Sequence, residues 1–193
     1  MDRIPIAILI SGRGSNMQAL IEACARPDYP ARIVLVFSNN EKAAGLKIAQ
    51  DAGLATHALD HRQFASRSAF EAQLHKILQK AGVRVICLAG FMRILTSEFV
   101  KAWDGRILNI HPSLLPKYPG LDTHKRALDS GDAIHGCTVH LVIPEVDLGP
   151  ILGQASVPVR PSDTVDVLAR RVLKEEHQLY PDVLERYLRN MTA

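Results

Sequence analysis

Short apolar runs alternate with longer amphipathic stretches through the first half of the chain. The apolar runs are nearly continuous, which is typical of parallel strands that are buried on both faces. The stretches between them have helical spacing, and several end at glycine or proline, as helices often do. The predicted strands cover residues 4–10, 33–37, 56–59, 83–89 and 107–110, and the predicted helices cover about 17–25, 45–52, 66–81 and 97–103.

The last third of the chain departs from this rhythm. Two further strand patterns are joined only by Pro144–Pro150, which is too short for a helical crossover, so these strands are expected to pair antiparallel. Pro158 indicates that the second strand runs along a sheet edge. A final helix follows, which Pro181 kinks or divides. These two strands cover residues 138–143 and 151–159, and the helix covers about 162–189.

The pattern as a whole predicts an α/β fold. We expect a Rossmann-like, doubly wound, mostly parallel sheet with helices on both faces and a late antiparallel strand pair. The 193 residues show no repeat, low-complexity segment or linker, so a single domain over residues 1–193 is the simplest account.

The amino-acid composition favours small anionic molecules over nucleic acid as binding partners. A formal net charge of +3 suits small anionic substrates but is too weak to indicate nucleic acid, and only 5% of the residues are aromatic, which disfavours a surface that stacks on bases. Cys24, Cys87 and Cys137 lie far apart, and none has a Cys-x-x-Cys partner. No signal peptide or membrane span is evident. We expect a cytoplasmic protein without metal, membrane or nucleic acid partner, either monomer or homodimer.

The sequence Asn109-Ile110-His111-Pro112 carries the clearest chemical signal. It follows the apolar pair Ile107-Leu108 and precedes a proline, so it marks the end of a strand. Residues two apart on a strand point to the same face, which aims an amide and an imidazole at one spot. Histidine can carry a proton and asparagine can hold a developing oxyanion. Such a pair is also common as a simple turn cap, so it requires supporting context.

A glycine-rich turn, Ser11–Asn16, joins the first predicted strand to the first helix. Gly12 and Gly14 match the start of a dinucleotide fingerprint, but Met17 occupies the third glycine position. The second strand ends in asparagines rather than in an acidic residue that would bind a ribose. A single phosphate at the start of the helix is the better prediction, and a tight turn that merely needs glycine is the alternative.

Asp147 is the best candidate to orient His111. It lies in the turn Pro144–Pro150 between the two late strands, where an isolated aspartate is more often a solvated turn residue. His140 alternates with apolar neighbours on the preceding strand. It is equally compatible with support for the site and with a purely structural histidine.

Four segments in order resemble one enzyme family. They are Ser11–Asn16, Leu88–Leu95, Asn109–Pro119 and Asp147-x-Gly-Pro. Together they are similar to the phosphoribosylglycinamide formyltransferases, folate-dependent enzymes of purine synthesis, over nearly the whole chain. The resemblance implies that the amine of glycinamide ribonucleotide attacks the formyl group of 10-formyltetrahydrofolate, which serves as co-substrate.

The resemblance also implies roles for individual residues. Asn109 would hold the tetrahedral oxyanion, His111 would shuttle protons, and Asp147 would raise the pKa of His111 and organise water. The implied ribonucleotide residues are Gly14, Ser15, Asn16 and Glu176. The implied folate residues are Arg67, Met92, Arg93, Ile94, Leu95, Asn109, Ile143, Pro144, Glu145, Val146 and Asp147.

One position departs from the family pattern, and several activities remain open. Leu148 stands where this family usually has glycine or another small residue. The alternatives are a formyltetrahydrofolate hydrolase, a formyltransferase acting on methionyl-tRNA or an amino sugar, and a non-catalytic mononucleotide-binding module. The hydrolases are expected to carry an extra domain before the glycine loop and the tRNA enzymes a basic C-terminal domain. We expect neither in this chain.

Overall fold

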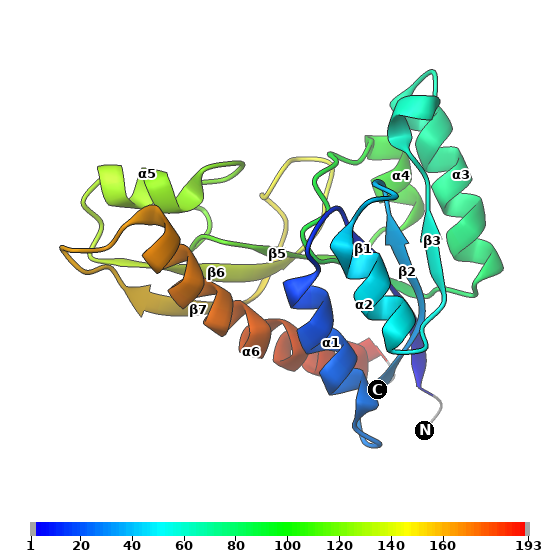
Figure 1. The fold of residues 1–193 in the computed structure, drawn as a ribbon, viewed down its shortest axis with the longest axis horizontal. Helices are drawn as coiled ribbons and strands as arrows, with labels where there is room; N and C mark the ends of the chain where they lie inside the picture. Colours follow the sequence, from blue (N-terminus) through cyan, green and yellow to red (C-terminus); the bar gives the residue numbers. More distant parts are fainter. Residues whose placement is uncertain (1–2, 192–193) are drawn as a thin grey trace.

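A computed structural model describes residues 3–191 and confirms the predicted fold class (Figure 1). Its strands are β1 (Ile4–Ile10), β2 (Ala31–Ser38), β3 (Thr56–Ala58), β4 (Val85–Leu88), β5 (Ile107–His111), β6 (Ile134–Leu141) and β7 (Ile151–Pro158). They form one sheet in the order β3-β2-β1-β4-β5-β6-β7. All pairs from β3 to β5 are parallel, whereas β5–β6 and β6–β7 are antiparallel. The chain leaves β1 on one side for β2 and returns on the other for β4, which is where ligands bind in such sheets.

Helices cover both faces of the sheet. They are α1 (Ser15–Ala25), α2 (Ala44–Asp51), α3 (Arg67–Lys80), α4 (Ser97–Ala102), α5 (Thr123–Asp129) and α6 (Val165–Met191), with a short 3-10 helix η1 (His61–Gln63). Figure 1 shows α6 running alongside α1 and beneath β6 and β7, while α3 and α4 lie at the other end of the sheet. Side chains of α1, α2 and α6 share one apolar cluster, and side chains of α3 and α4 share a second.

Strand β1 shows why its sequence is apolar at nearly every position. Ile6, Ile8 and Ile10 belong to the cluster with α1 and α6, whereas Ala7 and Leu9 belong to the cluster with α3 and α4. Each of these five side chains is fully buried. Alternate residues of a strand point to opposite faces, so a strand covered on both faces needs apolar residues throughout.

Three features were not predicted. Helix α5 has only seven residues, and its two buried residues, Thr123 and Ala127, are polar and small, so the sequence shows no apolar pattern there. Strand β6 begins at Ile134, four residues before the predicted start, because the polar and small residues His135 and Gly136 pair with β7. The antiparallel pairing of β5 with β6 was also missed, and it decides the geometry of the site described below.

Helix α6 continues unbroken through Pro181, so the proline does not divide it. The preceding residue, Tyr180, is fully buried, and its hydroxyl donates to the carbonyls of Leu88 and Leu108 at 3.1 and 3.0 Å. The hydroxyl of Tyr29 donates to the carbonyl of Pro181 at 2.8 Å. The Tyr180 bonds tie the middle of α6 to the last residue of β4 and the second residue of β5, and the Tyr29 bond ties it to the loop between α1 and β2. No helix within residues 3–191 is both long enough and apolar enough to cross a membrane.

Candidate active site

The loops after β1 and β4 meet at the carboxyl edge of the parallel strands. The amide of Ser11 donates to the carbonyl of Gly90 at 3.1 Å, and the Ser11 hydroxyl accepts from the amide of Met92 at 2.8 Å. Strand β5 pairs with β4 and ends at the same edge, at His111. The glycine turn, the segment around Met92 and the Asn109–His111 strand end therefore belong to one region.

Asn109 and His111 point to the same face of β5, as predicted. The antiparallel pairing sets His140 of β6 opposite Asn109 and Thr138 opposite His111. Directly paired residues on antiparallel strands share a face and have neighbouring side chains. The Nδ2 atom of Asn109 lies 3.2 Å from Nε2 of His140, and Nδ1 of His140 lies 2.9 Å from the carbonyl of Leu141. Since a carbonyl only accepts, His140 carries its proton on Nδ1, and its Nε2 accepts from the Asn109 amide.

The Asp147 carboxylate closes over this face. Its Oδ2 lies 3.4 Å from Nδ1 of His111, and its Oδ1 lies 3.5 Å from Nε2 of His140. The amide of Gly120 donates to Oδ2 at 2.8 Å. Asp147 has a φ of 56°, a left-handed conformation that turns its side chain into the site. The Asp147 carboxylate therefore contacts side chains from both β5 and β6 and a backbone amide of the loop that follows β5.

The protonation of His111 is constrained by its neighbours. Its Nε2 lies 2.9 Å from the carbonyl of Tyr118, so Nε2 must carry a proton, and Nδ1, which faces Asp147, is the atom that gains or loses one. His111 is 5% exposed. Burial lowers its pKa, and the backbone bond to Tyr118 and the charge of Asp147 oppose that shift without cancelling it. Asp147 acts in the predicted direction, but the net pKa of His111 lies below its ordinary value because burial outweighs the carboxylate.

The pKa of Asp147 lies below its ordinary value. Burial alone would raise it, but the neighbouring His140 side chain, the hydrogen bond from the amide of Gly120 and the charge of a protonated His111 together outweigh burial and lower it. Asp147 is therefore an anion at neutral pH, able to stabilise an imidazolium at His111.

The glycine turn leaves the start of α1 open. Gly14 precedes the helix with a φ of 77°, and no side chain caps the first turn. A Cβ atom on Gly14 would lie 2.9 Å from Cε of Met17 and 3.0 Å from Cα of Gly45, so the loop has no room for a side chain there. Uncapped amides at a helix N-terminus form an anion site. Gly14 and Ser15 form this uncapped helix start, and phosphate binding there stays a prediction.

Asn16 and Glu176 form a buried pair beside this turn. Nδ2 of Asn16 donates to Oε2 of Glu176 at 2.6 Å, and the two residues are 8% and 7% exposed. Burial raises the pKa of Glu176, and the bond from Asn16 partly opposes that shift. Oδ1 of Asn16 is buried and has no hydrogen-bond partner within the described residues. A hydroxyl group of a ligand would satisfy that acceptor.

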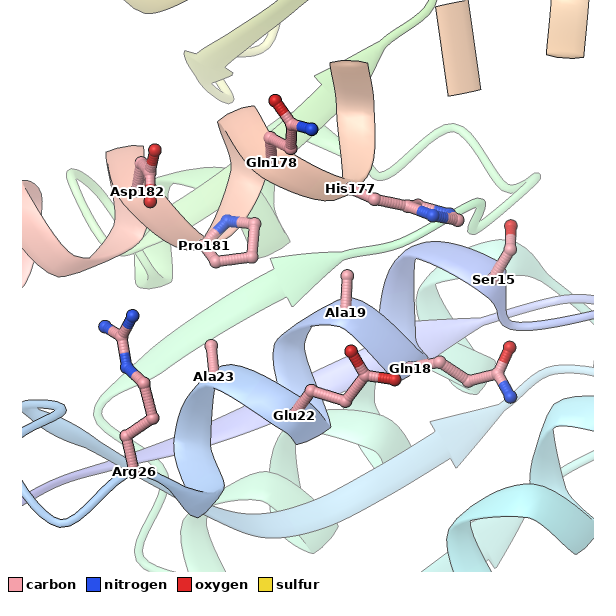
Figure 2. A pocket seen from close by; sticks show the side chains of 10 residues that line it. All are labelled: Ser15, Gln18, Ala19, Glu22, Ala23, Arg26, His177, Gln178, Pro181 and Asp182. Carbon is pink, nitrogen blue, oxygen red and sulfur yellow. The ribbon is translucent and has the colours of Figure 1, made fainter. Parts of the chain in front are cut away.

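A groove of about 730 Å³ lies between α1 and α6. Figure 2 shows Ser15, Gln18 and His177 at one end of it and Arg26 and Asp182 at the other. Ser15 is the one predicted site residue in its lining. The groove therefore adjoins the predicted phosphate position but is separate from the Asn109, His111 and Asp147 cluster.

The predicted folate residues form two exposed segments. In the first, Met92 and Ile94 are 66% and 58% exposed, whereas Leu95 is buried in the apolar cluster with α3 and α4. Nε of Arg93 is buried without a partner in the described part of the chain. In the second, Ile143–Asp147, Val146 is 47% exposed. Neither segment is helix or strand. Their main-chain groups and apolar side chains are available to a flat, partly apolar ligand.

Arg67 is exposed at the start of α3. It lies one helical turn before Glu71, whose carboxylate accepts from the amide of Thr96 at 2.9 Å and also from the Thr96 hydroxyl. Residues four apart share a helix face. Arg67 therefore lies on the side of α3 that contacts the end of the Met92–Leu95 segment.

Sequence reasoning left His140 undecided and missed the Tyr118 carbonyl and the Gly120 amide. The signal for His140 was its position opposite Asn109, which becomes visible only once the β5–β6 pairing is known. The Tyr118 carbonyl and the Gly120 amide are backbone groups, so no residue type in the sequence could have identified them. Within residues 3–191, no group of three or more His, Cys, Asp or Glu side chains is arranged to hold a metal ion.

Comparison with known proteins points to one family. The chain matches the formyl transferase family over residues 4–184. It is 49% identical over 179 residues to the phosphoribosylglycinamide formyltransferase of Escherichia coli strain K12, covering 93% of this chain and 84% of that protein. It is 47% identical over 184 residues to the trifunctional purine biosynthetic protein adenosine-3 of Gallus gallus, covering 95% of this chain but only 18% of that protein. The chain thus spans less than a fifth of such trifunctional relatives.

Solved structures agree with this assignment. A crystal structure of phosphoribosylglycinamide formyltransferase from Brucella melitensis superposes with a TM-score of 0.93 at 52% identity, covering 97% of this chain and 96% of that one. A crystal structure of glycinamide ribonucleotide transformylase 1 from Symbiobacterium toebii superposes with a TM-score of 0.95 at 45% identity, covering 97% and 89% of the two chains.

Proposed function

Because the chain belongs to the formyl transferase family, we propose that it transfers the formyl group of 10-formyltetrahydrofolate to the amine of glycinamide ribonucleotide, a step of purine biosynthesis. The relatives named for this activity match this chain along nearly its whole length. The observation that carries the proposal is the convergence of Asn109, His111 and Asp147 on one face at the end of β5. We further propose that the protein acts in the cytoplasm, as a monomer or homodimer.

In the proposed reaction the amine nitrogen bonds to the formyl carbon, and the formyl oxygen becomes an oxyanion. One N–H of the Asn109 amide is held by His140, which leaves the other free to donate to that oxyanion. The bond from the formyl carbon to the folate nitrogen then breaks. The leaving nitrogen gains the proton that the attacking amine has lost.

His111 is the group proposed to carry that proton. Because burial lowers its pKa, Nδ1 is free to accept a proton from the attacking amine at neutral pH. The imidazolium formed in this way faces Asp147 at 3.4 Å and is stabilised by its charge. The same proton is then available to the leaving folate nitrogen. Nε2 keeps its own proton throughout because the carbonyl of Tyr118 holds it.

The two substrates are proposed to approach from opposite sides of this cluster. The phosphate of the ribonucleotide would bind the open amides of Gly14, Ser15 and Asn16, and its ribose would meet Glu176. The folate would lie between the two exposed segments, with its glutamate carboxylate near Arg67. The proposed folate-contacting residues of these segments are Met92, Arg93, Ile94, Leu95, Ile143, Pro144, Glu145 and Val146.

An absorbance assay tests the proposal. The protein is incubated with glycinamide ribonucleotide and a 10-formyl folate, and each substrate is omitted in turn. Deformylation of the folate that requires both substrates is the expected result. Turnover without the ribonucleotide would identify a hydrolase, and turnover only with another amine would identify a different formyltransferase. Binding without turnover of either substrate would identify a non-catalytic module.

A further inference from the structure

The chain that follows His111 turns back so that Tyr118 faces it. The carbonyl of Tyr118 lies 2.9 Å from Nε2 of His111, and two residues later the amide of Gly120 donates to Asp147 at 2.8 Å. This short segment therefore contacts both members of the proposed proton-transferring pair, His111 and Asp147, through backbone atoms. Both contacts depend on the backbone conformation at Tyr118.

Tyr118 adopts a backbone conformation that its own residue type disfavours. Its φ is 57°, in the left-handed region that glycine adopts easily and a bulky aromatic residue rarely does. It also precedes Pro119, and the residue before a proline ordinarily prefers an extended backbone. The Ser113 hydroxyl donates to the carbonyl of Lys117 at 2.6 Å, which fixes the residue before Tyr118 but not the Tyr118 side chain. Such a conformation persists only where surrounding contacts hold it.

Asp132 holds the Tyr118 side chain. This residue lies in the turn between α5 and β6, and its Oδ2 accepts from the Tyr118 hydroxyl at 2.8 Å. Its carboxylate also accepts from Nζ of Lys117 at 2.8 and 3.0 Å. Hydrogen bonds from Lys117 and from Tyr118 lower the pKa of Asp132, so it is an anion at neutral pH and can only accept. A hydrogen bond to a charged acceptor is stronger than one between neutral groups.

The other contacts of Tyr118 involve its ring rather than its hydroxyl. The guanidinium of Arg126 lies 5.1 Å from the ring centroid, and the ammonium of Lys117 lies 5.9 Å from it. The His135 ring packs against the Tyr118 ring with centroids 6.2 Å apart. The bond to Asp132 uses the hydroxyl and the ring contacts do not, so a single substitution can separate the two kinds of contact.

We propose that Asp132 is a positioning residue for the formyl transfer: its carboxylate holds the Tyr118 side chain, so that the left-handed backbone of Tyr118 directs its carbonyl at Nε2 of His111. The same bond fixes the segment whose Gly120 amide holds Asp147. This inference rests on the proposed function, since the position and tautomer of His111 matter to turnover only if His111 acts in the transfer.

The Tyr118 carbonyl and Asp147 compete for the proton of a neutral His111. A carbonyl beside Nε2 favours the proton on that nitrogen, whereas the Asp147 anion, 3.4 Å from Nδ1, favours it there. If the Tyr118 carbonyl moves away, the proton should pass to Nδ1. Nδ1 can then no longer accept a proton from the attacking amine. The bond from Tyr118 to Asp132 would in this way keep Nδ1 of His111 available.

Two substitutions remove this bond from its two sides. Tyr118→Phe removes only the hydroxyl and leaves the ring contacts in place. Asp132→Ala removes the carboxylate and also releases Lys117, whose exposed side chain returns to water. Each variant and the double variant are assayed for kcat and for KM of both substrates. The tautomer of neutral His111 is measured in the ligand-free proteins by NMR of its ring nitrogens.

We expect Tyr118→Phe and Asp132→Ala each to lower kcat by roughly 10- to 100-fold, the range for a displaced catalytic group, with both KM values changed less than about threefold. The fraction of His111 protonated on Nδ1 should rise in both. The double variant should lose no more kcat than Asp132→Ala, because the two changes remove the same bond.

Three outcomes would overturn the proposal. The first is a normal kcat with His111 still protonated on Nε2 in folded Tyr118→Phe. The second is a loss of kcat without any change of the His111 tautomer, which would indicate a merely structural role. The third is a double variant in which the two losses multiply. If Asp132→Ala does not fold, Tyr118→Phe decides.

Tyr187 provides a matched control. Its hydroxyl, on α6, donates to the carbonyl of Gly105, which precedes the amino end of β5, whereas His111 ends that strand. Tyr187→Phe should lower thermal stability without changing kcat or the His111 tautomer. If the wild-type protein turned over neither substrate, the proposed function would fail, whereas the His111 tautomer in the ligand-free proteins would still show whether Asp132 positions that ring.

Discussion

The two parts of the candidate site, the proposed ribonucleotide site at the start of α1 and the cluster at the end of β5, use different kinds of chemical group. The proposed ribonucleotide end consists mainly of backbone, a left-handed glycine and an uncapped helix start, beside one buried side-chain pair, Asn16 and Glu176. The proposed catalytic end consists of side chains, in which one carboxylate, Asp147, faces two imidazoles. The first end has its shape before any ligand arrives and does not depend on the protonation of His111. The second end changes its charge during the proposed reaction.

Because of this difference, we expect mutations in the two parts of the site to change different kinetic parameters. A backbone anion site acts mainly through binding, so changes near Gly14 should appear in the KM of the ribonucleotide. Changes in the side-chain cluster should appear in kcat and in the pH profile. The predictions below test that division, in order of decreasing effect.

The largest effect is expected for His111→Ala. Loss of the proton carrier should lower kcat by roughly 10²- to 10⁴-fold, with the fold retained. Steady-state kinetics measure kcat, and circular dichroism shows whether the fold is retained. His57→Ala, at an exposed imidazole of β3, is the matched control and should remain active. Near-normal turnover of His111→Ala would remove this residue from the mechanism.

Asn109→Ala should lower kcat on the order of 10²- to 10³-fold, as for a lost oxyanion donor. The same change frees Nε2 of His140 from its amide partner, so the ring resonances of His140 should change in the NMR spectrum. Asn190→Ala, at an exposed position near the end of α6, controls for the loss of an amide. A variant with unchanged kcat and a shifted His140 would show that Asn109 serves only His140.

Gly14→Val tests the backbone end. A Cβ atom would meet Met17 and Gly45, and the φ of 77° is strained for a β-branched residue, so the first turn of α1 must move. The KM of the ribonucleotide should rise by roughly tenfold or more, corresponding to about 1.4 kcal/mol, while the KM of the folate changes little. Equal increases in both would indicate general damage to the loop rather than loss of a phosphate site.

Asp147→Asn removes a charge with little change in volume. Asp147 raises the pKa of His111 against the larger effect of burial, so its loss should lower that pKa further. The imidazolium is then less stable at any given pH, and the acid limb of the kcat profile should move to lower pH. A titration of His111 by NMR measures the shift directly. An unchanged or raised pKa would exclude Asp147 from tuning His111.

The smallest effect is expected at Leu148. This side chain is 60% exposed beside Val146, so it is free to contact a bound folate. Leu148→Gly should weaken folate binding several-fold, or by roughly 1 kcal/mol, because the loop gains conformational freedom and loses an apolar contact. Ribonucleotide affinity should not change. Gly149 cannot serve as a control, since a Cβ there would lie 1.8 Å from the carbonyl of Leu141. Calorimetry with each ligand decides the matter, and tighter folate binding would contradict the prediction.

Local patterns predicted much of the fold and part of the site. The apolar runs identified β1, β2, β4 and β5, because these strands are buried on both faces and need apolar residues throughout. The shared face of Asn109 and His111 followed from the strand period alone. The edge position of the strand containing Pro158 was also predicted correctly.

The remainder depends on contacts between distant residues. The role of His140 follows from a pairing with Asn109, 31 residues earlier in the chain, and no local pattern encodes that pairing. The left-handed conformations of Tyr118 and Asp147 are stabilised by tertiary contacts rather than by glycine. Burial, which outweighs Asp147 in determining the pKa of His111, is likewise a property of the assembled fold.

The Tyr180 hydroxyl has a consequence for the dynamics of the protein. It bonds the carbonyls of Leu88, the last residue of β4, and Leu108, the second residue of β5, from the middle of a helix whose side chains pack into the core. Helix α6 therefore cannot detach without breaking its bonds to both strands, so we expect the helix and the two strands to open together as one cooperative unit. Amide hydrogens near Tyr180 and those of β4 and β5 should exchange with solvent only through global unfolding. The exposed segments around Met92 and Val146 should exchange orders of magnitude faster, so these two proposed folate-contacting loops are expected to move while the strands and helix beneath them stay fixed.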